Sequence, residues 1–342
     1  MKLLNKQVRP HHTHPQSQLG ITLIELMIAL VIGLLATGAM LKVYVDSSRL
    51  YRFNEGLARI QENGRFGLEF IRRDARMAGF WGCYHGADLT NRISPGSTGY
   101  ISYELNDITG TNNDGLNSSD SIAFSGAGNS VATVSSNMTS ADSAIPISST
   151  GIFELGEALL ISDCETADIF QLTSIGGSAP SLTLIHGTEG NTSVELSKAY
   201  AAGSRLYRVQ QITFCIAEGA NPAQPSLRQL VNPTSGQTCQ DHGDELVEGI
   251  ENMQVLFGED TEANDDGTNS DGTANRYLSF GADDLDMDRV VSVRIFLLAR
   301  SLNDNLTTEP SPYFFVDQEP APDDKRLRKV FTTTITLRNK SG

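Results

Sequence analysis

The chain has 342 residues, of which 39% are hydrophobic and 20% are charged, and its formal net charge is −15. This length and composition allow one large or two modest folded domains. The acidic balance argues against nucleic-acid binding, because a chain of this charge repels phosphates unless a local basic patch dominates.

A polar leader, residues 1–20, precedes a nearly unbroken apolar run from Ile21 to Leu41. Roughly 20 apolar residues are enough for a helix to cross a bilayer. The leader contains three basic residues and no acids, so the positive-inside tendency predicts a cytoplasmic N-terminus, and removal of the leader would change the net charge to −18. A secretory signal peptide is the competing interpretation, but no A-x-A-like cleavage site is obvious after Leu41.

One acid interrupts the apolar run near its start, at Glu25. A carboxylate at membrane depth costs at least ~2.5 kcal/mol, so acids inside membrane spans are functional by default. If the chain were cut after Gly20, Ile21 would carry a new α-amino group, and Glu25 could meet such an amine on a neighbouring subunit. The competing interpretation is an ordinary membrane anchor that contains a stray glutamate.

The junction of leader and apolar run carries a recognisable signal. Gly20, followed by residues 21–25 (ITLIE), resembles the prepilin signal of type IV pilins and type II secretion pseudopilins. The resemblance implies that a prepilin peptidase cuts between Gly20 and Ile21, that Ile21 is then N-methylated, and that Glu25 aids subunit docking during assembly. The family more often has Phe where Ile21 stands, a departure that the peptidase should tolerate.

Beyond the apolar run, an amphipathic pattern continues the helix. Apolar or small residues recur at three- and four-residue steps, which predicts one buried face, and glycines at 79 and 82 end the pattern. The positions are Leu50, Phe53, Leu57, Ile60, Gly64, Leu68, Ile71, Ala75 and Ala78. We expect the globular domain to cover this face.

From Cys83 onward the composition shifts to Ser, Thr, Gly, Asn and Asp, and short β-rich runs alternate with turn signals. This pattern predicts an all-β or α+β domain. The expected strands are residues 121–125, 157–162, 168–173, 181–185, 205–216, 248–257, 290–298 and 330–337. The expected loops are residues 106–119, 135–149, 259–275 and 307–325.

Four cysteines occur, and all lie in the part of the chain that we expect outside the cytoplasm, where disulfides persist. None forms a CxxC pair, which argues against zinc and thioredoxin-like chemistry. Four cysteines allow three pairings, and the sequence alone does not choose among them. We favour Cys83–Cys164, which would tie the end of the helix to the sheet, and Cys215–Cys239, which would close a loop that contains Pro and Gly.

Motifs for catalysis are absent: there is no G-x-S-x-G elbow, Walker loop or H-E-x-x-H. We therefore expect neither an enzyme nor a cofactor. Glu262, Asn264 and Asp266 precede a glycine at alternate positions, as oxygen ligands do in calcium loops. The segment departs from the EF-hand pattern, so we favour a solvated loop and keep calcium as the alternative.

A basic patch near the C-terminus stands out against the acidic chain. Its residues are Lys325, Arg326, Arg328 and Lys329. A basic edge strand that avoids aggregation, or that meets an acidic partner subunit, explains the patch as well as nucleic acid does.

Several further segments resemble PilW-type minor pilins of the type IV pilus. They are residues 59–66 (RIQENGRF), 76–83 (RMAGFWGC), 162–164 (SDC), 247–254 (VEGIENMQ) and 333–339 (TTITLRN). The resemblance implies a type IV pilin-like α+β fold, with a long N-terminal helix packed on a β-rich domain. Four parts are expected: a prepilin leader (1–20), a transmembrane and assembly helix (21–43), its amphipathic continuation (44–80) and a β-rich periplasmic domain (81–342).

The same resemblance implies a minor pilin that primes pilus assembly, sits in the tip complex and supports twitching motility. The implied partners are other minor pilins, the major pilin, the prepilin peptidase and the inner-membrane assembly platform. The implied location is the inner membrane, with one span and the globular domain in the periplasm, and afterwards the pilus tip. The alternatives are a minor pseudopilin of a type II secretion system and an adhesin or binding module displayed at the tip.

Overall fold

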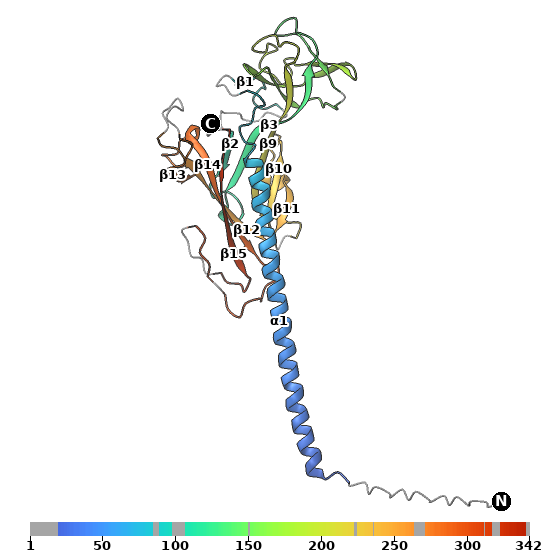
Figure 1. Cartoon of the computed structure of the whole chain (residues 1–342), viewed down its shortest axis with the longest axis vertical. Helices are drawn as coiled ribbons and strands as arrows, with labels where there is room; N and C mark the ends of the chain where they lie inside the picture. Colours follow the sequence, from blue (N-terminus) through green and yellow to red (C-terminus); the bar gives the residue numbers. More distant parts are fainter. Residues whose placement is uncertain are drawn as a thin grey trace, which may run out of the picture. The chain divides into compact units, whose positions relative to one another are not determined.

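The computed structural model describes residues 20–84, 89–97, 107–149, 151–221, 224–234, 236–262, 271–310, 312–316 and 322–339. The chain divides into two compact units, Met1–Arg52 and Phe53–Gly342. One long helix, α1 (Leu23–Ala75), contributes residues to both units (Figure 1).

In the first unit, the described residues form the start of α1 and none of them is buried. Most of the large apolar side chains between Ile21 and Val45 are more than half exposed. By length and composition, α1 is long and apolar enough to span a membrane.

In the second unit, α1 supplies the buried face that its sequence predicts. The buried positions are Ile60, Gly64, Gly67, Leu68, Ile71, Asp74 and Ala75. Leu50 departs from the prediction, because it belongs to the first unit and is 60% exposed. The helix also ends at Ala75 rather than Ala78, since the backbone tightens there: Met77 N donates to Asp74 O, and Gly79 adopts a φ of +72°.

The larger of the two sheets has 11 strands, in the order β1-β6-β5-β9-β3-β4-β8-β7, with β10, β11 and β2 on side branches. Its pairings are antiparallel except for β1 with β6. The strands are β1 (Leu89–Asn91), β2 (Ile108–Thr111), β3 (Ser121–Val134), β4 (Ile145–Ser148), β5 (Ala158–Ser162), β6 (Ala167–Gln171), β7 (Ser174–Ser178), β8 (Ser181–Ile185), β9 (Arg205–Glu218), β10 (Pro225–Val231) and β11 (Asp244–Glu248). A short helix, α2 (Cys239–His242), links β10 and β11.

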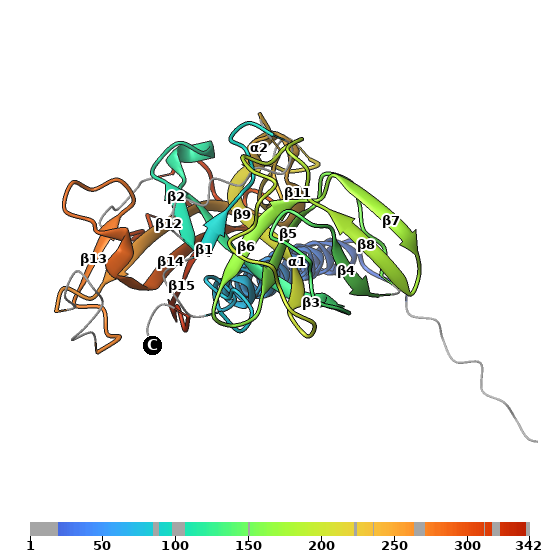
Figure 2. The same ribbon diagram turned by 90° about the horizontal axis from the view of Figure 1, so that it is seen from above.

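The smaller sheet is antiparallel, in the order β13-β12-β14-β15. Its strands are β12 (Ile250–Glu259), β13 (Arg276–Ser279), β14 (Val290–Arg300) and β15 (Arg328–Thr336). Two 3-10 turns, η1 (Leu116–Ser118) and η2 (Met287–Arg289), precede β3 and β14. Figure 2 shows β13 at one side of the second unit and β7 at the other.

The main core joins the second half of α1 to both sheets. Side chains of the helix, such as Ile71, pack with Phe214 of the larger sheet and Leu297 of the smaller one in one buried cluster. Helix glycines permit the close approach. A Cβ on Gly64 would lie 2.3 Å from the Phe331 ring, and one on Gly67 would lie 2.9 Å from Leu297. The glycines that weaken the helix as an isolated element thus let the sheet pack tightly on it.

The α+β fold with a long N-terminal helix is therefore confirmed, and each of the eight expected strands overlaps an observed one. Two expected loops are wrong in part. β2 lies within the expected loop 106–119, and β4 lies within the expected loop 135–149. Both strands are four residues long and pair with β3, so tertiary pairing rather than local pattern holds them. The expected strand 248–257 is divided at Gly249, whose φ of +76° turns the chain between β11 and β12.

A second core lies in the lobe formed by β4, β5, β6 and β8, and it includes Phe170, Tyr200 and Leu206. Asp168 of β6 is fully buried beside this core and accepts from Arg92 Nε (3.0 Å), Tyr200 Oη (2.7 Å) and both N and Oγ of Ser197 (2.8 and 2.9 Å). Burial and the Asp168 carboxylate raise the pKa of Tyr200, so its hydroxyl keeps the proton that it donates. The four hydrogen bonds to the buried Asp168 carboxylate thus connect β6 to two other segments of this lobe, one around Arg92 and one around Ser197 and Tyr200, and stabilise it.

We predict that Asp168→Asn lowers the free energy of unfolding by about 3–5 kcal/mol, because it leaves Arg92 without its buried anionic partner. Chemical denaturation of the protein in detergent, followed by tryptophan fluorescence, measures the change. The control is Glu69→Gln, which breaks an exposed pair with Arg72 and should cost less than about 1 kcal/mol. Equal stability of the Asp168→Asn variant and the wild type would contradict this role.

Candidate functional site at the start of the helix

The first turn of α1 is built by a reciprocal pair of side chains, Thr22 and Glu25. Thr22 Oγ1 accepts a hydrogen bond from Glu25 N (3.3 Å), and Glu25 Oε2 accepts from Thr22 N (3.1 Å) and Thr22 Oγ1 (3.0 Å). This arrangement is a capping box, in which the residue before the helix and the third helical residue satisfy each other's free amides. Glu25 thus has a local role that does not depend on any partner.

The sequence interpretation missed this cap, although a signal for it exists. Thr22-x-x-Glu25 directly before an apolar run matches the T-x-x-E pattern of a capping box. The cap also explains why an acid is tolerated at this point, because a carboxylate near a helix N-terminus interacts favourably with the helix dipole. The cap does not explain the apolar surface that follows.

That apolar surface covers the helix on all sides after Glu25. The next charged residue is Lys42, which forms an exposed pair with Asp46 at 3.1 Å. Even the polar Thr37 turns its hydroxyl back onto the helix and donates to Gly33 O at 2.8 Å. The side chains of Ile21, Leu23 and Leu34 are each 77% exposed. Such a surface requires an apolar environment, either lipid or other helices.

Gly20 and Ile21 lie just before the capped turn, and both are exposed. A Cβ added at Gly20 would meet no atom within 4 Å, and its φ lies outside the left-handed region. Neither close packing nor backbone conformation therefore requires a glycine at this position. Residues 1–19 lie outside the described part of the chain.

The cysteines form two disulfides, Cys83–Cys164 and Cys215–Cys239, which are the pairs that we favoured. Cys83 follows the end of α1 and Cys164 lies between β5 and β6, so the first bond joins the helix end to the second lobe. The second bond joins β9 to the start of α2. Both bonds lie within the second unit and far along the chain from Glu25.

Of the three proposed calcium ligands, only Glu262 lies among the described residues. Glu262 is described and exposed, and its backbone N donates to Asp260 Oδ1 at 3.0 Å. Asn264 and Asp266 lie outside the described residues. Within the described ranges, no group of three or more His, Cys, Asp or Glu side chains is arranged to hold a metal ion.

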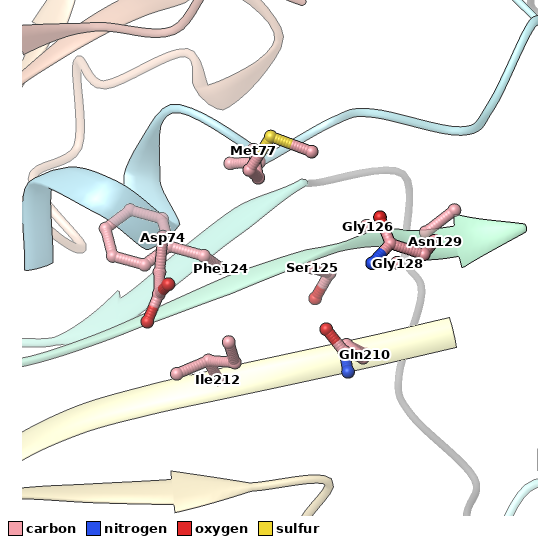
Figure 3. Close-up of a pocket in the computed structure, with 11 residues that line it drawn as sticks. Asp74, Met77, Phe124, Ser125, Gly126, Gly128, Asn129, Gln210 and Ile212 are labelled. Carbon is pink, nitrogen blue, oxygen red and sulfur yellow. The ribbon is translucent and has the colours of Figure 1, made fainter. Parts of the chain in front are cut away.

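A pocket of about 220 Å³ opens where the end of α1 meets β3 and β9. Figure 3 shows Met77 on the helix side of β3, with Gln210 and Ile212 along β9. The one carboxylate in the lining, Asp74, is held by Arg73 (2.9 Å) and Gln229 (3.0 Å). No histidine or cysteine is among the residues that line the pocket. No pattern in the sequence predicted it.

Comparison with known proteins agrees with the geometry of both units. The family profile of the prokaryotic N-terminal methylation motif matches residues 15–41, and that of type IV pilus-assembly protein W matches residues 213–339. Among solved structures, the chain is similar to a type IV-like pilin from Thermus thermophilus, at 11% identity and a TM-score of 0.35, over 83% of this chain and 99% of that one. No curated protein matches the chain.

The methylation motif at the start of an apolar helix, followed by a strand-rich domain, defines a type IV pilin-like protein. The motif and the apolar helix indicate that the chain is anchored in a membrane. The PilW profile begins in β9 and extends beyond β15, and so includes the whole smaller sheet. Together the two profiles support a PilW-type minor pilin of the type IV pilus, a type IV pilin-like protein involved in pilus assembly.

We predict that Thr22→Ala loosens the first turn of α1, because it removes the hydroxyl that caps the helix. The expected cost is about 1 kcal/mol, seen as roughly fivefold faster hydrogen exchange at the amide of Glu25 in detergent micelles. Thr37→Ala is the control and should leave exchange at Glu25 unchanged. The Thr37 hydroxyl donates to Gly33 O, a carbonyl that also accepts a backbone hydrogen bond within the helix. Unchanged exchange at Glu25 in the Thr22→Ala variant would show that the box does not hold the helix start.

Proposed function

We propose that this chain is a priming minor pilin that is processed at Gly20–Ile21 and assembled through α1. A prepilin peptidase cuts after Gly20 on the cytoplasmic side and methylates the new amine of Ile21. The apolar helix then holds the subunit in the inner membrane, with the globular domain in the periplasm, until it joins the pilus. The observation that carries this proposal is the exposed apolar segment of residues 21–41, whose single acid, Glu25, lies one turn from the proposed cleavage point.

The transfer from lipid to fibre conserves the apolar surroundings of the helix. In the fibre, the exposed face of residues 21–43 would pack among the helices of other subunits, so its apolar area stays away from water. The new α-amine of a neighbour would carry a positive charge into the same interior. A buried charge is unfavourable alone and tolerable when paired, so we assign Glu25 the role of that partner.

The four-part division of the chain follows from this sequence of events. Residues 1–20 are the leader, 21–43 are the membrane and assembly segment, 44–80 continue the helix, and 81–342 form the periplasmic domain. The globular domain would contact other minor pilins and the major pilin, while the inner-membrane platform drives assembly. We place the subunit in the tip complex, where it starts polymerisation and so supports twitching motility. The PilW profile over residues 213–339 favours this pilus role over a secretion pseudopilin.

No step of this function requires catalysis or a cofactor. In this proposal the subunit moves its apolar helix from lipid into the fibre and contacts other subunits through its globular domain. Both processes depend on the surface of the protein and not on a catalysed reaction. We therefore propose a non-enzymatic role. Affinity purification of the chain tagged after Gly342, with mass spectrometry, tests the assignment: minor pilins should co-purify. Co-purification of secretion components instead would overturn it.

We predict that replacement of Glu25 separates its two roles. Glu25→Gln keeps the capping box, because Gln serves at the third helical position, but it removes the charge. If Glu25 pairs with an amine, both Glu25→Gln and Glu25→Ala should be processed normally and enter sheared pili at least about tenfold less than the wild type, since an unpaired buried charge costs about 3–5 kcal/mol. Immunoblots of pilus and membrane fractions, with mass spectrometry of the N-terminus, measure both steps.

Thr22→Ala is the matched control, because it removes the cap and keeps the charge. It should be processed and incorporated like the wild type. Normal incorporation of Glu25→Gln would show that Glu25 serves the helix cap alone and would overturn the pairing role.

A further inference from the structure

The last strand of the chain, β15, lies at an edge of the smaller sheet. It pairs with β14 in an unbroken antiparallel register from Ser292↔Thr336 to Arg300↔Arg328. No other described strand pairs with its opposite side. A strand of nine residues with one unpaired side is a long free edge, and such edges readily accept another strand.

The register shows which backbone groups face outward. Leu337 N donates to Val291 O (2.9 Å) and Ser301 N donates to Leu327 O (2.8 Å), so the odd-numbered residues of β15 bond β14. The N–H and C=O groups of the even-numbered residues therefore point to the open side. These residues are Val330, Thr332, Thr334 and Thr336. Within the described ranges, no hydrogen bond from another element reaches their backbone groups.

Helix α1 covers a face of β15 and leaves this edge open. Phe331 lies against Gly64, and Arg72 Nη2 donates to Thr333 Oγ1 at 2.8 Å, so the odd-numbered side chains face the helix. Thr332, Thr334 and Thr336 are exposed on the other face. Threonine suits a pleated strand, so the edge is already in the conformation that an added strand needs.

The surroundings of the edge are basic, although the protein as a whole is acidic. Arg72 lies on the flank of α1 that faces β15, and the helix repeat places Arg65 and Arg76 on the same flank. Lys329 lies over the Phe331 ring at 5.5 Å, and Arg338 is exposed just beyond the strand. Two acids share this flank: Glu69 pairs with Arg72 at 3.4 Å, and the helix repeat also places Glu62 there. These charges favour an acidic occupant.

A second copy of β15 is a poor occupant for the same reason. Antiparallel self-pairing that joins the free groups would place Val330 opposite Thr336 and would bring Arg328 opposite Arg338 at both ends. This register makes Arg328 and Arg338 cross-strand neighbours of like charge, although Arg328 already pairs with Glu251 and Asp324. Like charges across strands are destabilising. The basic border thus disfavours this symmetric pairing and favours an acidic strand.

We propose that the free edge of β15 accepts an extended acidic segment of a neighbouring pilus subunit as an added β-strand. The backbone groups of Val330, Thr332, Thr334 and Thr336 would supply the hydrogen bonds. Lys329 and Arg338, with the arginines of α1, would select an acidic sequence. That the segment belongs to a pilus subunit rests on the proposed function, whereas the strand-accepting edge itself does not.

The test uses the full chain in detergent micelles and two synthetic peptides. One alternates threonine and valine with glutamate, and the other has lysine at every glutamate position. The acidic peptide should slow hydrogen exchange at the amides of Thr332 and Thr334, and it should bind at least about tenfold more tightly than the basic peptide. No protection at these amides, or equal binding of the two peptides, would overturn the proposal.

Variants of one outward-facing residue separate backbone pairing from side-chain contact. Thr334→Pro removes an outward N–H and leaves the ladder to β14 intact, so binding should weaken about fivefold or more. Thr334→Ala keeps that N–H and should bind within about twofold of the wild type. Equal binding by the proline variant and the wild type would contradict strand addition.

A variant with two altered surface charges keeps the test decisive if proline disturbs folding. Lys329→Gln with Arg338→Gln leaves the backbone unchanged and should weaken binding of the acidic peptide roughly tenfold. Unchanged affinity would overturn the charge selection. Because this assay needs no pilus, its failure leaves the Glu25 experiments untouched, and failure of those experiments leaves the strand edge intact.

Discussion

The apolar surface of the first part of α1 is the constraint on which the rest of the protein depends. Between Glu25 and Lys42 no side chain is charged, and no described residue of this unit is buried. Exposed apolar area costs roughly 25 cal/mol per Å² in water, so a helix of this kind always needs an apolar surrounding. A bilayer supplies it in the free subunit and other helices would supply it in a fibre. Assembly would then move the helix from lipid to the other helices of the fibre and expose little of its apolar area to water.

Glu25 links the local stability of this helix to the proposed assembly. Its carboxylate accepts hydrogen bonds from Thr22 N and Thr22 Oγ1, so it is satisfied before any partner arrives. A neighbouring amine would therefore add to, or compete with, bonds that already exist. A hydrogen bond to a charged group contributes about 1.5–3 kcal/mol. The free energy that a neighbouring amine gains by pairing with Glu25 would therefore be reduced by any of these bonds that it displaces.

The globular unit complements the helix by chemistry of the opposite kind. It contains paired strands, two disulfides and a buried carboxylate, Asp168. The glycines of α1 couple the two sheets to the helix, because Gly64 and Gly67 admit Phe331 and Leu297 where a larger side chain would clash. β15 is thus packed directly against the second half of α1.

The sequence by itself determined the features that are local and periodic: the helix, its apolar half, the methylation motif and the strongly alternating strands such as β14. Tertiary structure alone decided the short strands β2 and β4, which exist because β3 lies beside them, and the four donors that converge on Asp168 from distant positions. It also decided which side of β15 stays unpaired. A periodic sequence pattern depends only on residues that are close along the chain. Strand pairing, burial and free strand edges depend on residues that folding brings together from distant positions.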